Sequence, residues 1–255
     1  MLENEQTQIK IGQLADLLFH APSIACLTGA GISTESGIPD FRSANGFYRM
    51  TSEEIFSIDF FRENPAAFYQ AMAPVYQTIF SAIPNAGHRA IADLEHLCGK
   101  KVTVVTQNID GLHTRAGSGN VHEIHGTLET FSCQICGRQY QGTGFRTTCE
   151  SGQVPHCDCG GVLKPDITFY GEQLPVLPYH AALQTMWETR LLLILGTSMQ
   201  VYPAAGLPRE CDSGTPFVII NKTATVIDFQ CKLVFHDNIG DILPAAVQKL
   251  RERLE

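Results

Sequence analysis

The stretch TGAGISTESGIPDFR, residues 28–42, decides the fold of this chain. It follows residues 23–27, SIACL, an apolar run that predicts a buried strand. Gly29 and Gly31 let the backbone turn sharply and approach a ligand closely, as turns that bind a dinucleotide pyrophosphate require. The continuation through residues 38–42 is not part of the ordinary dehydrogenase fingerprint. The stretch therefore predicts a turn that binds a dinucleotide, in a protein whose motif differs from that of ordinary dehydrogenases.

Composition and charge argue against several classes of protein. The 255 residues carry a net charge of -8, whereas non-specific DNA binding needs a basic face. No apolar run approaches the ~20 residues of a membrane span, and the acidic start of the chain is not typical of a signal peptide. Nine cysteines, four of them clustered, suit a reducing compartment better than a disulfide framework. We expect a cytoplasmic protein with no nucleic-acid or membrane partner.

Further apolar runs predict a parallel sheet. Three of them lack alternation, as strands covered on both faces do: residues 102–105, 191–195 and 217–220. Apolar residues recur at helical spacing near the start of the chain, after the capping residue Asn85 and at the end of the chain. Strands that alternate with helices predict an α/β fold, a doubly wound, parallel, Rossmann-like sheet.

Two stretches do not fit this alternation. Residues 44–80 are rich in aromatic residues and helical in pattern, and residues 128–166 contain the clustered cysteines and several glycines. We interpret both as insertions that form a smaller lobe beside the sheet, one helical and one zinc-binding. The Rossmann-like domain then comprises residues 1–43, 81–127 and 167–255.

Four cysteines have the spacing of metal ligands. Cys133-x-x-Cys136 is followed, after 20 intervening residues, by Cys157-x-Cys159. Two such pairs can place four thiolates tetrahedrally at about 2.3 Å from a zinc ion. Four sulfur ligands leave no open position, so one structural zinc is predicted rather than a catalytic one. Because the second pair has one spacer residue where two are commoner, Cys149 remains an alternative ligand.

Polar residues follow the predicted strands at the edge where ligands bind in such sheets. Asn108 and Asp110 follow the strand at 102–105, and an amide-bearing ring can donate to Asp110 and accept from Asn108. Helix capping is an equally good interpretation of these two residues. After the next two strands, Ser198 is a candidate for phosphate or ribose and Asn221 for the adenosine ribose.

His125 is a candidate general base. It stands three residues after His122, whereas the zinc-protease motif needs a spacing of four, so this is not that metal motif. A lone histidine is more often structural than catalytic. His125, however, precedes Gly126 and the cysteine insertion, which places it where the two lobes meet. An imidazole there suits proton abstraction near neutral pH.

Taken together, these motifs resemble those of the sirtuins, the NAD-dependent protein deacylases, in their prokaryotic-like single-domain form. The resemblance covers about residues 22–225 and includes the segments GAGIS, GIPDFR, TQNIDGLH, IHG, KPDITFYGE, LGTSMQVYPAA and VIIN as well as the four cysteines. It implies that NAD is a consumed co-substrate. Acetyl groups would be removed from protein lysines, giving nicotinamide, free lysine and O-acetyl-ADP-ribose.

The resemblance also implies roles for individual residues. His125 would be the general base, with Asn108 as a second catalytic residue. The NAD site would comprise Gly29, Ala30, Gly31, Ser33, Thr34, Asp40, Phe41, Arg42, Gln107, Asn108, Ile109, Asp110, His125, Gly196, Thr197, Ser198 and Asn221. An acyl-lysine peptide is expected to add as a strand at Thr168, Tyr170, Gly171, Glu172 and Val201. The family usually has an aliphatic residue at the position of Thr168.

The sequence leaves open which acyl group is preferred and whether the activity is instead ADP-ribosyl transfer. A protein ADP-ribosyltransferase would use the same glycine run and His125, and the sequence barely separates the two. Sirtuins that prefer succinyl or malonyl groups carry a Tyr-x-x-Arg pair in the helical insertion, whereas here Met72 follows Tyr69 at that spacing. An apolar Met72 favours neutral acyl groups, acetyl foremost, and its pliable side chain can admit longer ones.

Overall fold

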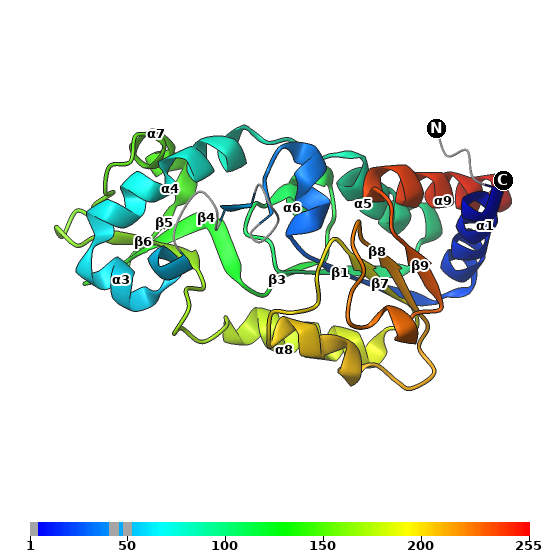
Figure 1. The fold of residues 1–255 in the computed structure, drawn as a ribbon. Helices are drawn as coiled ribbons and strands as arrows, with labels where there is room; N and C mark the ends of the chain where they lie inside the picture. The colour runs from blue at the N-terminus through cyan, green and yellow to red at the C-terminus, as the bar shows by residue number, and fades with distance from the viewer. Residues whose placement is uncertain (1–4, 41–45, 48–52) are drawn as a thin grey trace.

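The computed structural model describes residues 5–40, 46–47 and 53–255 (Figure 1). Phe41 and Arg42, both predicted at the NAD site, lie outside these residues. Within the described ranges the larger sheet has six parallel strands in the order β3-β2-β1-β7-β8-β9. They are β1 (Ser23–Thr28), β2 (Lys101–Thr106), β3 (Val121–Glu123), β7 (Leu192–Leu195), β8 (Phe217–Ile220) and β9 (Leu233–Phe235).

The strand order reverses beside β1. The chain runs outward from β1 through β2 to β3 on one side, and returns to β7, β8 and β9 on the other. The four strands predicted from apolar runs are confirmed as β1, β2, β7 and β8. The edge strands β3 and β9 were not predicted, because three residues each make too short a run to stand out.

Helices cover both faces of this sheet (Figure 1). In β1, Cys26 faces α1 (Glu5–His20), α5 (Ala86–Cys98) and α9 (Ile239–Leu254), whereas Ala25 and Leu27 face α8 (Val176–Glu188) and η4 (Ala204–Glu210). This alternation follows from the pleat of a strand. The predicted doubly wound fold is confirmed. Leu254, the last residue of α9, is 48% exposed because it lies in the final turn.

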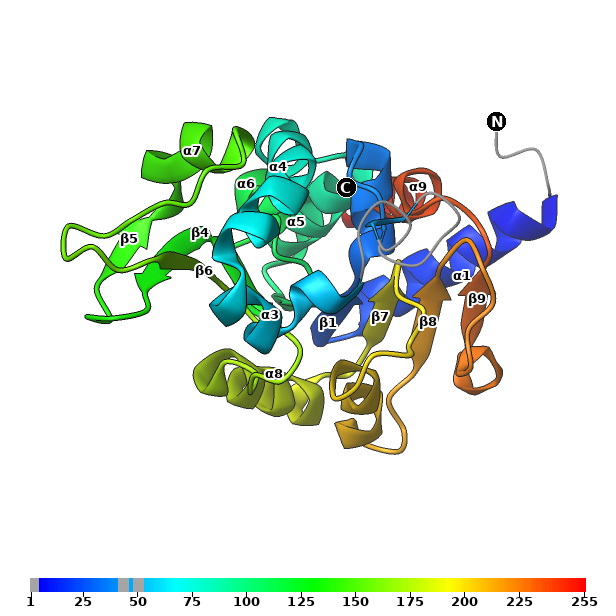
Figure 2. The same ribbon diagram turned by 60° about the vertical axis from the view of Figure 1, so that its left-hand side comes forward.

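The smaller lobe is built on an antiparallel sheet in the order β5-β4-β6. Its strands are β4 (Gly126–Cys133), β5 (Gln139–Gln141) and β6 (Leu163–Ile167), and its helices are α3 (Ile58–Glu63), α4 (Pro65–Ser81) and α7 (Arg146–Glu150) (Figure 2). One aromatic core joins them, in which Phe61 and Phe68 from the helices pack against Phe169. The two insertions therefore fold as one lobe.

The expected division of the chain into a sheet domain and two insertions stays a prediction. The expected boundary between residues 127 and 128 falls inside β4, and the one between residues 166 and 167 falls inside β6. The first residue of β4, Gly126, pairs with the last residue of β6, Ile167.

The shorter elements are η1 (Ala30–Ser36), η2 (Glu53–Phe56), α6 (Leu112–Ala116), η3 (Gly142–Phe145) and η5 (Asp228–Gln230). Among the described residues, no helix has the length and apolar character needed to cross a membrane.

Candidate active site

The turn after β1 lies directly against the turn after β7. Gly31 N donates to Gly196 O over 2.8 Å, and a Cβ on Gly31 would lie 2.7 Å from Gly196 Cα. Gly196 has φ +63°, a conformation that favours glycine. The glycines at 29, 31 and 196 are therefore needed for close backbone approach. This contact lies where the strand order reverses, which is where doubly wound sheets bind their ligands.

Beside this turn, Ser33, Asn108 and Asp110 form a buried polar network. Ser33 Oγ donates to Asp110 Oδ2 over 2.6 Å and accepts from Asn108 Nδ2 over 3.1 Å. The second hydrogen of Asn108 Nδ2 goes to Gly29 O, also over 3.1 Å. Both amide hydrogens of Asn108 are used, so in this arrangement Asn108 does not donate to a ligand amide as predicted. Asp110 keeps acceptor capacity, because each carboxylate oxygen can accept two hydrogen bonds.

Burial raises the pKa of Asp110 above its ordinary value, and hydrogen bonds from Ser33 and from Leu112 N oppose that shift. The capping interpretation also has support, because Leu112 N at the start of α6 donates to Asp110 Oδ1 over 2.9 Å. The carboxylate thus anchors a helix with one oxygen and Ser33 with the other. Of the two interpretations that the sequence left open, helix capping is confirmed for Asp110, and binding of a ligand amide stays a prediction.

Two buried histidines support this network, and sequence reasoning missed both. Asn85 N donates to His88 Nδ1, so His88 Nε2 carries the proton and faces Ser33 Oγ at 3.5 Å. His113 Nε2 lies 2.9 Å from Thr28 Oγ1, and the two imidazole rings are 4.8 Å apart. Burial lowers the pKa of His88 to about 4 and that of His113 to about 3. Both rings are therefore neutral at pH 7. The sequence named Asn85 as a capping residue, and its capping box uses His88, whereas His113 stands in the segment TQNIDGLH without a predicted role.

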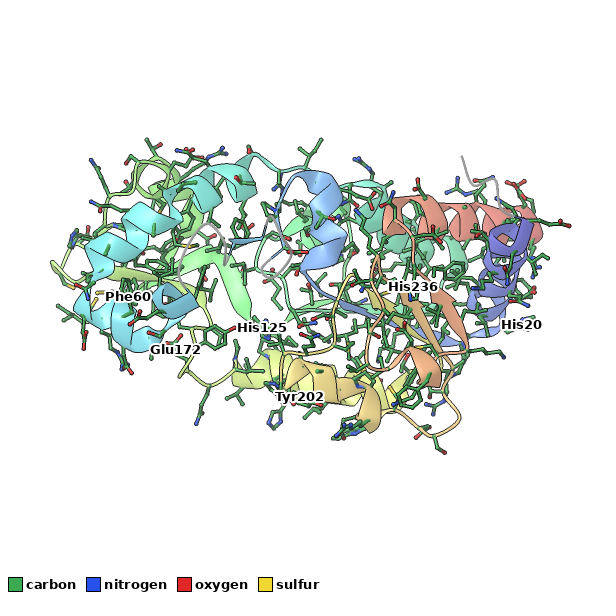
Figure 3. All side chains as sticks on the ribbon, in the orientation of Figure 1. His20, Phe60, His125, Glu172, Tyr202 and His236 are labelled. Atoms are coloured by element: carbon green, nitrogen blue, oxygen red, sulfur yellow. The ribbon has the colours of Figure 1, made fainter. Side chains whose placement is uncertain are left out.

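His125 lies where the sheet and the smaller lobe meet (Figure 3). Its Nδ1 is 3.0 Å from Gln107 O, and a carbonyl can only accept, so Nδ1 carries the proton. In the neutral ring Nε2 then keeps its lone pair. Burial lowers the pKa of His125 below its ordinary 6.5, although the bond to Gln107 opposes this. The neutral, proton-accepting form is favoured at physiological pH.

Backbone contacts on its other side hold His125 to the small lobe. Thr168 N donates to His125 O over 2.8 Å, and the next residue, Gly126, has φ +79°. A Cβ on Gly126 would lie only 2.0 Å from Asp166 O. Glycine is therefore required where β4 leaves His125 and passes against β6.

The other predicted NAD-site residues within the described ranges follow the strand ends. Gln107 Nε2 donates to Thr197 Oγ1 over 3.1 Å, which joins the loops after β2 and β7. Ser198 comes next and is half-buried, and Asn221 follows the adjacent strand β8, where its side chain donates to Thr223 O. Ala30 and Thr34 lie in η1, Asp40 follows it, and Ile109 O accepts from Leu128 N of β4.

The expected peptide segment that begins at Thr168 lies beside His125, but part of its backbone and of the backbone at Val201 is already paired. Tyr170 N donates to Phe56 O over 2.8 Å, and Tyr170 O accepts from Ile58 N over 3.0 Å. Val201 O accepts from Ala205 N. Tyr170 therefore does not present a free strand edge as predicted, because the segment joining η2 to α3 occupies it. An added peptide strand would have to pair with the neighbouring residues instead.

The four clustered cysteines converge on one point. The Sγ atoms of Cys133, Cys136, Cys157 and Cys159 all lie within 4.8 Å of one another, and two pairs are 3.5 Å apart. A tetrahedral zinc with Zn–S bonds of 2.3 Å sets sulfur atoms about 3.8 Å apart. The four cysteines are placed to bind one metal ion and fit a structural zinc. Cys149 is instead buried in the small-lobe core, outside this cluster.

Comparison with known proteins identifies relatives along nearly the whole chain. The model of the Sir2 family matches residues 29–203. An NAD-dependent protein deacetylase of Chromobacterium violaceum is 43% identical over 241 residues, covering 92% of this chain and 96% of its own length. A second one, of Sulfolobus acidocaldarius, is 38% identical over 241 residues, covering 94% of each chain.

Solved structures agree with these relatives. A Sir2 enzyme structure superposes with a TM-score of 0.88 at 34% identity, covering 97% of this chain and 100% of its own. A Sir2 variant solved with a deacetylated p53 peptide and 3′-O-acetyl ADP-ribose gives a TM-score of 0.87 at 38% identity, covering 93% and 97%. The resemblance stated from the motifs is confirmed, and this chain belongs to the Sir2 family.

Proposed function

We propose that the protein removes acetyl groups from lysine residues of proteins or peptides in a reaction that consumes NAD. The observation that supports this most is the state of His125, a neutral imidazole whose Nδ1 proton is held by Gln107 O and whose Nε2 lone pair is available. It stands where the sheet, with its dinucleotide-binding turn, meets the smaller lobe. The curated relatives named NAD-dependent protein deacetylases support the same reaction.

The residues present fit NAD by their chemistry. Asp110 offers an acceptor to an amide group, and glycine turns at the strand ends allow a pyrophosphate to approach the backbone. We assign the NAD site to the predicted residues at the ends of β1, β2, β7 and β8, together with Phe41 and Arg42. These are Gly29, Ala30, Gly31, Ser33, Thr34, Asp40, Gln107, Asn108, Ile109, Asp110, His125, Gly196, Thr197, Ser198 and Asn221.

When bound, NAD would supply an anomeric ribose carbon, with nicotinamide as its leaving group, to the acyl oxygen of the substrate lysine. His125 Nε2 would accept a proton through the ribose hydroxyls, which frees the 2′-oxygen to bond to the acyl carbon. Water added to that carbon would let the carbon–nitrogen bond break, so that lysine is released and the acyl group stays on ADP-ribose. Asn108 serves by position, because its amide fixes Ser33 and the carbonyl of Gly29. The neighbouring Asp110 holds Ser33 from the other side.

The acyl pocket is expected beside the small-lobe helices. Tyr69 and Met72 of α4 are fully buried, and Tyr69 Oη donates to Leu163 O over 2.6 Å. This tyrosine hydroxyl is already satisfied and neutral, and Met72 offers no charge. An acidic acyl chain would bury a carboxylate without a cationic partner, which costs several kcal/mol. We therefore propose a preference for neutral acyl groups, with acetyl foremost and longer neutral groups as alternatives.

The cytoplasmic location stays a prediction. It is supported by the cysteine cluster, since four thiolate ligands suit a reducing compartment. The formal net charge of -8 likewise supports peptide rather than nucleic-acid partners.

A protein ADP-ribosyltransferase is the second candidate, because it would use the same NAD site and His125. Mass spectrometry of an acetyl-lysine peptide incubated with the protein and NAD separates the two. Deacetylation predicts free lysine peptide, nicotinamide and O-acetyl-ADP-ribose in equal amounts. A peptide or protein that gains the mass of ADP-ribose while the acetyl group remains would refute the deacetylase.

A further inference from the structure

Lys164 of β6 is a buried cation for which the proposed mechanism has no use. Its side chain is 9% exposed, and although its backbone lies opposite Ser132 of β4, its Nζ reaches along β6 to Ile167 and Glu172. Lysine is almost never fully buried unless it is paired. Its surroundings therefore indicate a specific role.

The ammonium group of Lys164 is fully satisfied by the end of β6 and by the loop that follows it. Nζ donates to Pro165 O over 3.2 Å, to Ile167 O over 2.9 Å and pairs with Glu172 Oε2 at 3.0 Å. These three acceptors match the three hydrogens of an ammonium group. Nζ also lies 4.5 Å from the centroid of the Phe169 ring, a cation–π distance.

Glu172 closes the same loop from its other end. Its Oε2 accepts from Phe169 N over 2.9 Å, and its own N–H donates to Phe169 O over 3.0 Å. Glu172, predicted to bind substrate, thus turns one carboxylate oxygen toward Lys164 and the loop backbone. Its side chain is 26% exposed, and Figure 3 shows it near His125 where the two lobes meet.

This loop is tied directly to the general base. Ile167 pairs with Gly126 across β4 and β6, and the following Thr168 N donates to His125 O over 2.8 Å. Lys164 Nζ donates to Ile167 O. The same cation therefore holds the residue that pairs with Gly126 and directly precedes Thr168, which contacts His125. We propose that Lys164 and Glu172 are a positioning pair that sets the loop 167–172, and the peptide it holds, relative to His125. This inference rests on the proposed peptide site.

Removing the cation takes one hydrogen-bond donor from Pro165 O and one from Ile167 O, and Glu172 loses its ion pair but keeps the bond from Phe169 N. A displacement of about 1 Å at a catalytic site can cost about 10²-fold in rate. The loop should shift while the NAD turn, which is built from β1, β2 and β7, keeps its own contacts. Loss of the pair should therefore be visible in peptide kinetics and not in NAD affinity.

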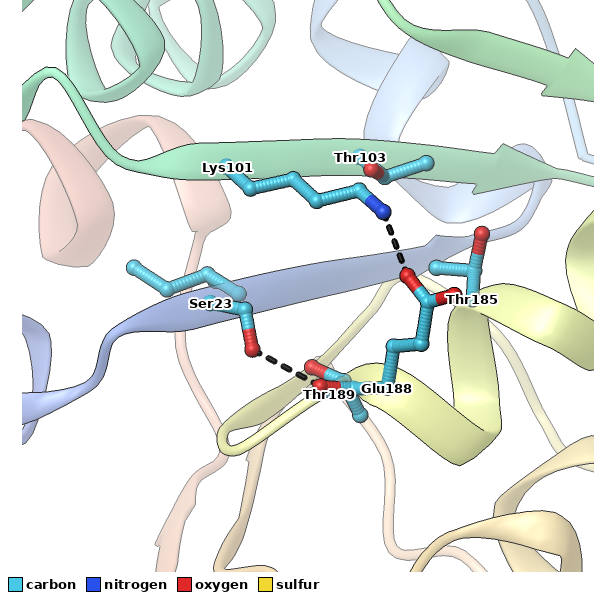
Figure 4. Close-up of a pocket in the computed structure, with 7 residues that line it drawn as sticks. Ser23, Lys101, Thr103, Thr185, Glu188 and Thr189 are labelled. Atoms are coloured by element: carbon cyan, nitrogen blue, oxygen red, sulfur yellow. Dashed lines mark hydrogen bonds and ion pairs between the residues drawn. The ribbon is translucent and has the colours of Figure 1, made fainter.

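The test compares Lys164→Met, Lys164→Arg and Glu172→Gln in the whole chain, with Lys101→Met as the matched control. Lys101 is also ion-paired, to Glu188, but it is exposed and lines a small hollow of about 10 Å³ at the amino-terminal ends of β1 and β2, opposite the predicted NAD site (Figure 4). The readouts are kcat and KM for an acetyl-lysine peptide, NAD affinity by calorimetry, and zinc content.

We expect Lys164→Met and Glu172→Gln to lower kcat/KM for the peptide about 10- to 100-fold, mainly through kcat because the peptide is displaced relative to His125, with NAD affinity and zinc content unchanged. Lys164→Arg should recover most of the loss, and Lys101→Met should stay within about twofold of the wild type. If Lys164→Met fails to fold, Glu172→Gln alone decides the outcome.

Peptide kinetics within twofold of the wild type would overturn the proposal. So would a parallel loss of NAD affinity, which would indicate a general structural role. The proposed function fails separately: a wild-type protein that does not deacetylate the peptide refutes it, whereas an unaffected Lys164→Met in an active protein refutes only the positioning pair.

Discussion

At the scale of single residues, hydrogen bonds decide which groups can do chemistry. The carbonyl of Gln107 fixes the proton of His125 on Nδ1, and Asn85 N fixes the proton of His88 on Nε2. His88 in turn faces Ser33, which donates to Asp110. These histidines have opposite functions, because His125 offers a lone pair to the site and His88 supports the hydroxyl that anchors the carboxylate.

Lowering the pH from 7 to 5 should destabilise the protein through its two buried histidines. His88 and His113 have pKa values of about 4 and 3 in the fold, against an ordinary 6.5. Between pH 6.5 and 4 the unfolded chain binds more protons, so stability that is complete above pH 6.5 is lost as the pH falls. At pH 5 each of these two histidines lowers the free energy of unfolding by about 2 kcal/mol relative to its value at pH 7.

Urea denaturation at pH 7 and at pH 5 measures this loss. His113→Gln is the informative variant, because it removes one titrating ring and keeps a polar side chain near Thr28. Its free energy of unfolding should depend less on pH than that of the wild type. An identical pH dependence in both proteins would contradict the assignment.

At the scale of elements, the sequence predicted the buried strands, which are long apolar runs, and the metal site, which has a typical ligand spacing. β1, β2, β7 and β8 were identified because strands covered on both faces are uniformly apolar. The small sheet was missed, because β4 alternates and its partner β5 has only three residues. The roles of His88, His113 and Lys164 could not be predicted, although the last two stand in motif segments, since burial and pairing across distant segments exist only once the chain has folded.

Removing the metal should unfold the small lobe before the sheet domain. The four cysteines form a closed site, so the binding free energy of zinc is also folding free energy. We expect one zinc per chain by elemental analysis, and a chelator should abolish tertiary signals from the aromatic core of the small lobe. Cys159→Ser should lose zinc, whereas Cys149→Ser should retain it. Purified protein without zinc, or the reverse result for these variants, would contradict the ligand assignment.

The helix α4 should set the acyl preference. Because Met72 lies at 0% exposure among the aromatic residues of the small lobe, catalytic efficiency on an acetyl-lysine peptide should exceed that on a matched succinyl-lysine peptide by at least 10²-fold, the equivalent of about 3 kcal/mol. Met72→Arg should shift this ratio toward succinyl, while Ala73→Arg on the same helix is the control. Equal turnover of both wild-type substrates would show that Met72 does not line the pocket.

At the scale of the whole molecule, two lobes meet at one histidine. The sheet domain contributes the loops after β1, β2, β7 and β8, and the smaller lobe contributes the β4–β6 pair and the loop 167–172. His125 is bonded to both, through its ring to Gln107 and through its carbonyl to Thr168. The fold class and this meeting point could be predicted from motif order, whereas the pairing of Tyr170 with Phe56 and Ile58 could not.

The central claim, that His125 is the general base of an NAD-dependent deacetylation, is tested most directly by His125→Ala. Rates of deacetylation of an acetyl-lysine peptide are measured for the wild type and the variant, with zinc content and thermal unfolding as controls for the fold. The account predicts a loss of about 10²- to 10⁴-fold with both controls unchanged, because that is the usual contribution of a positioned base. A variant that keeps more than a tenth of the wild-type rate would contradict it.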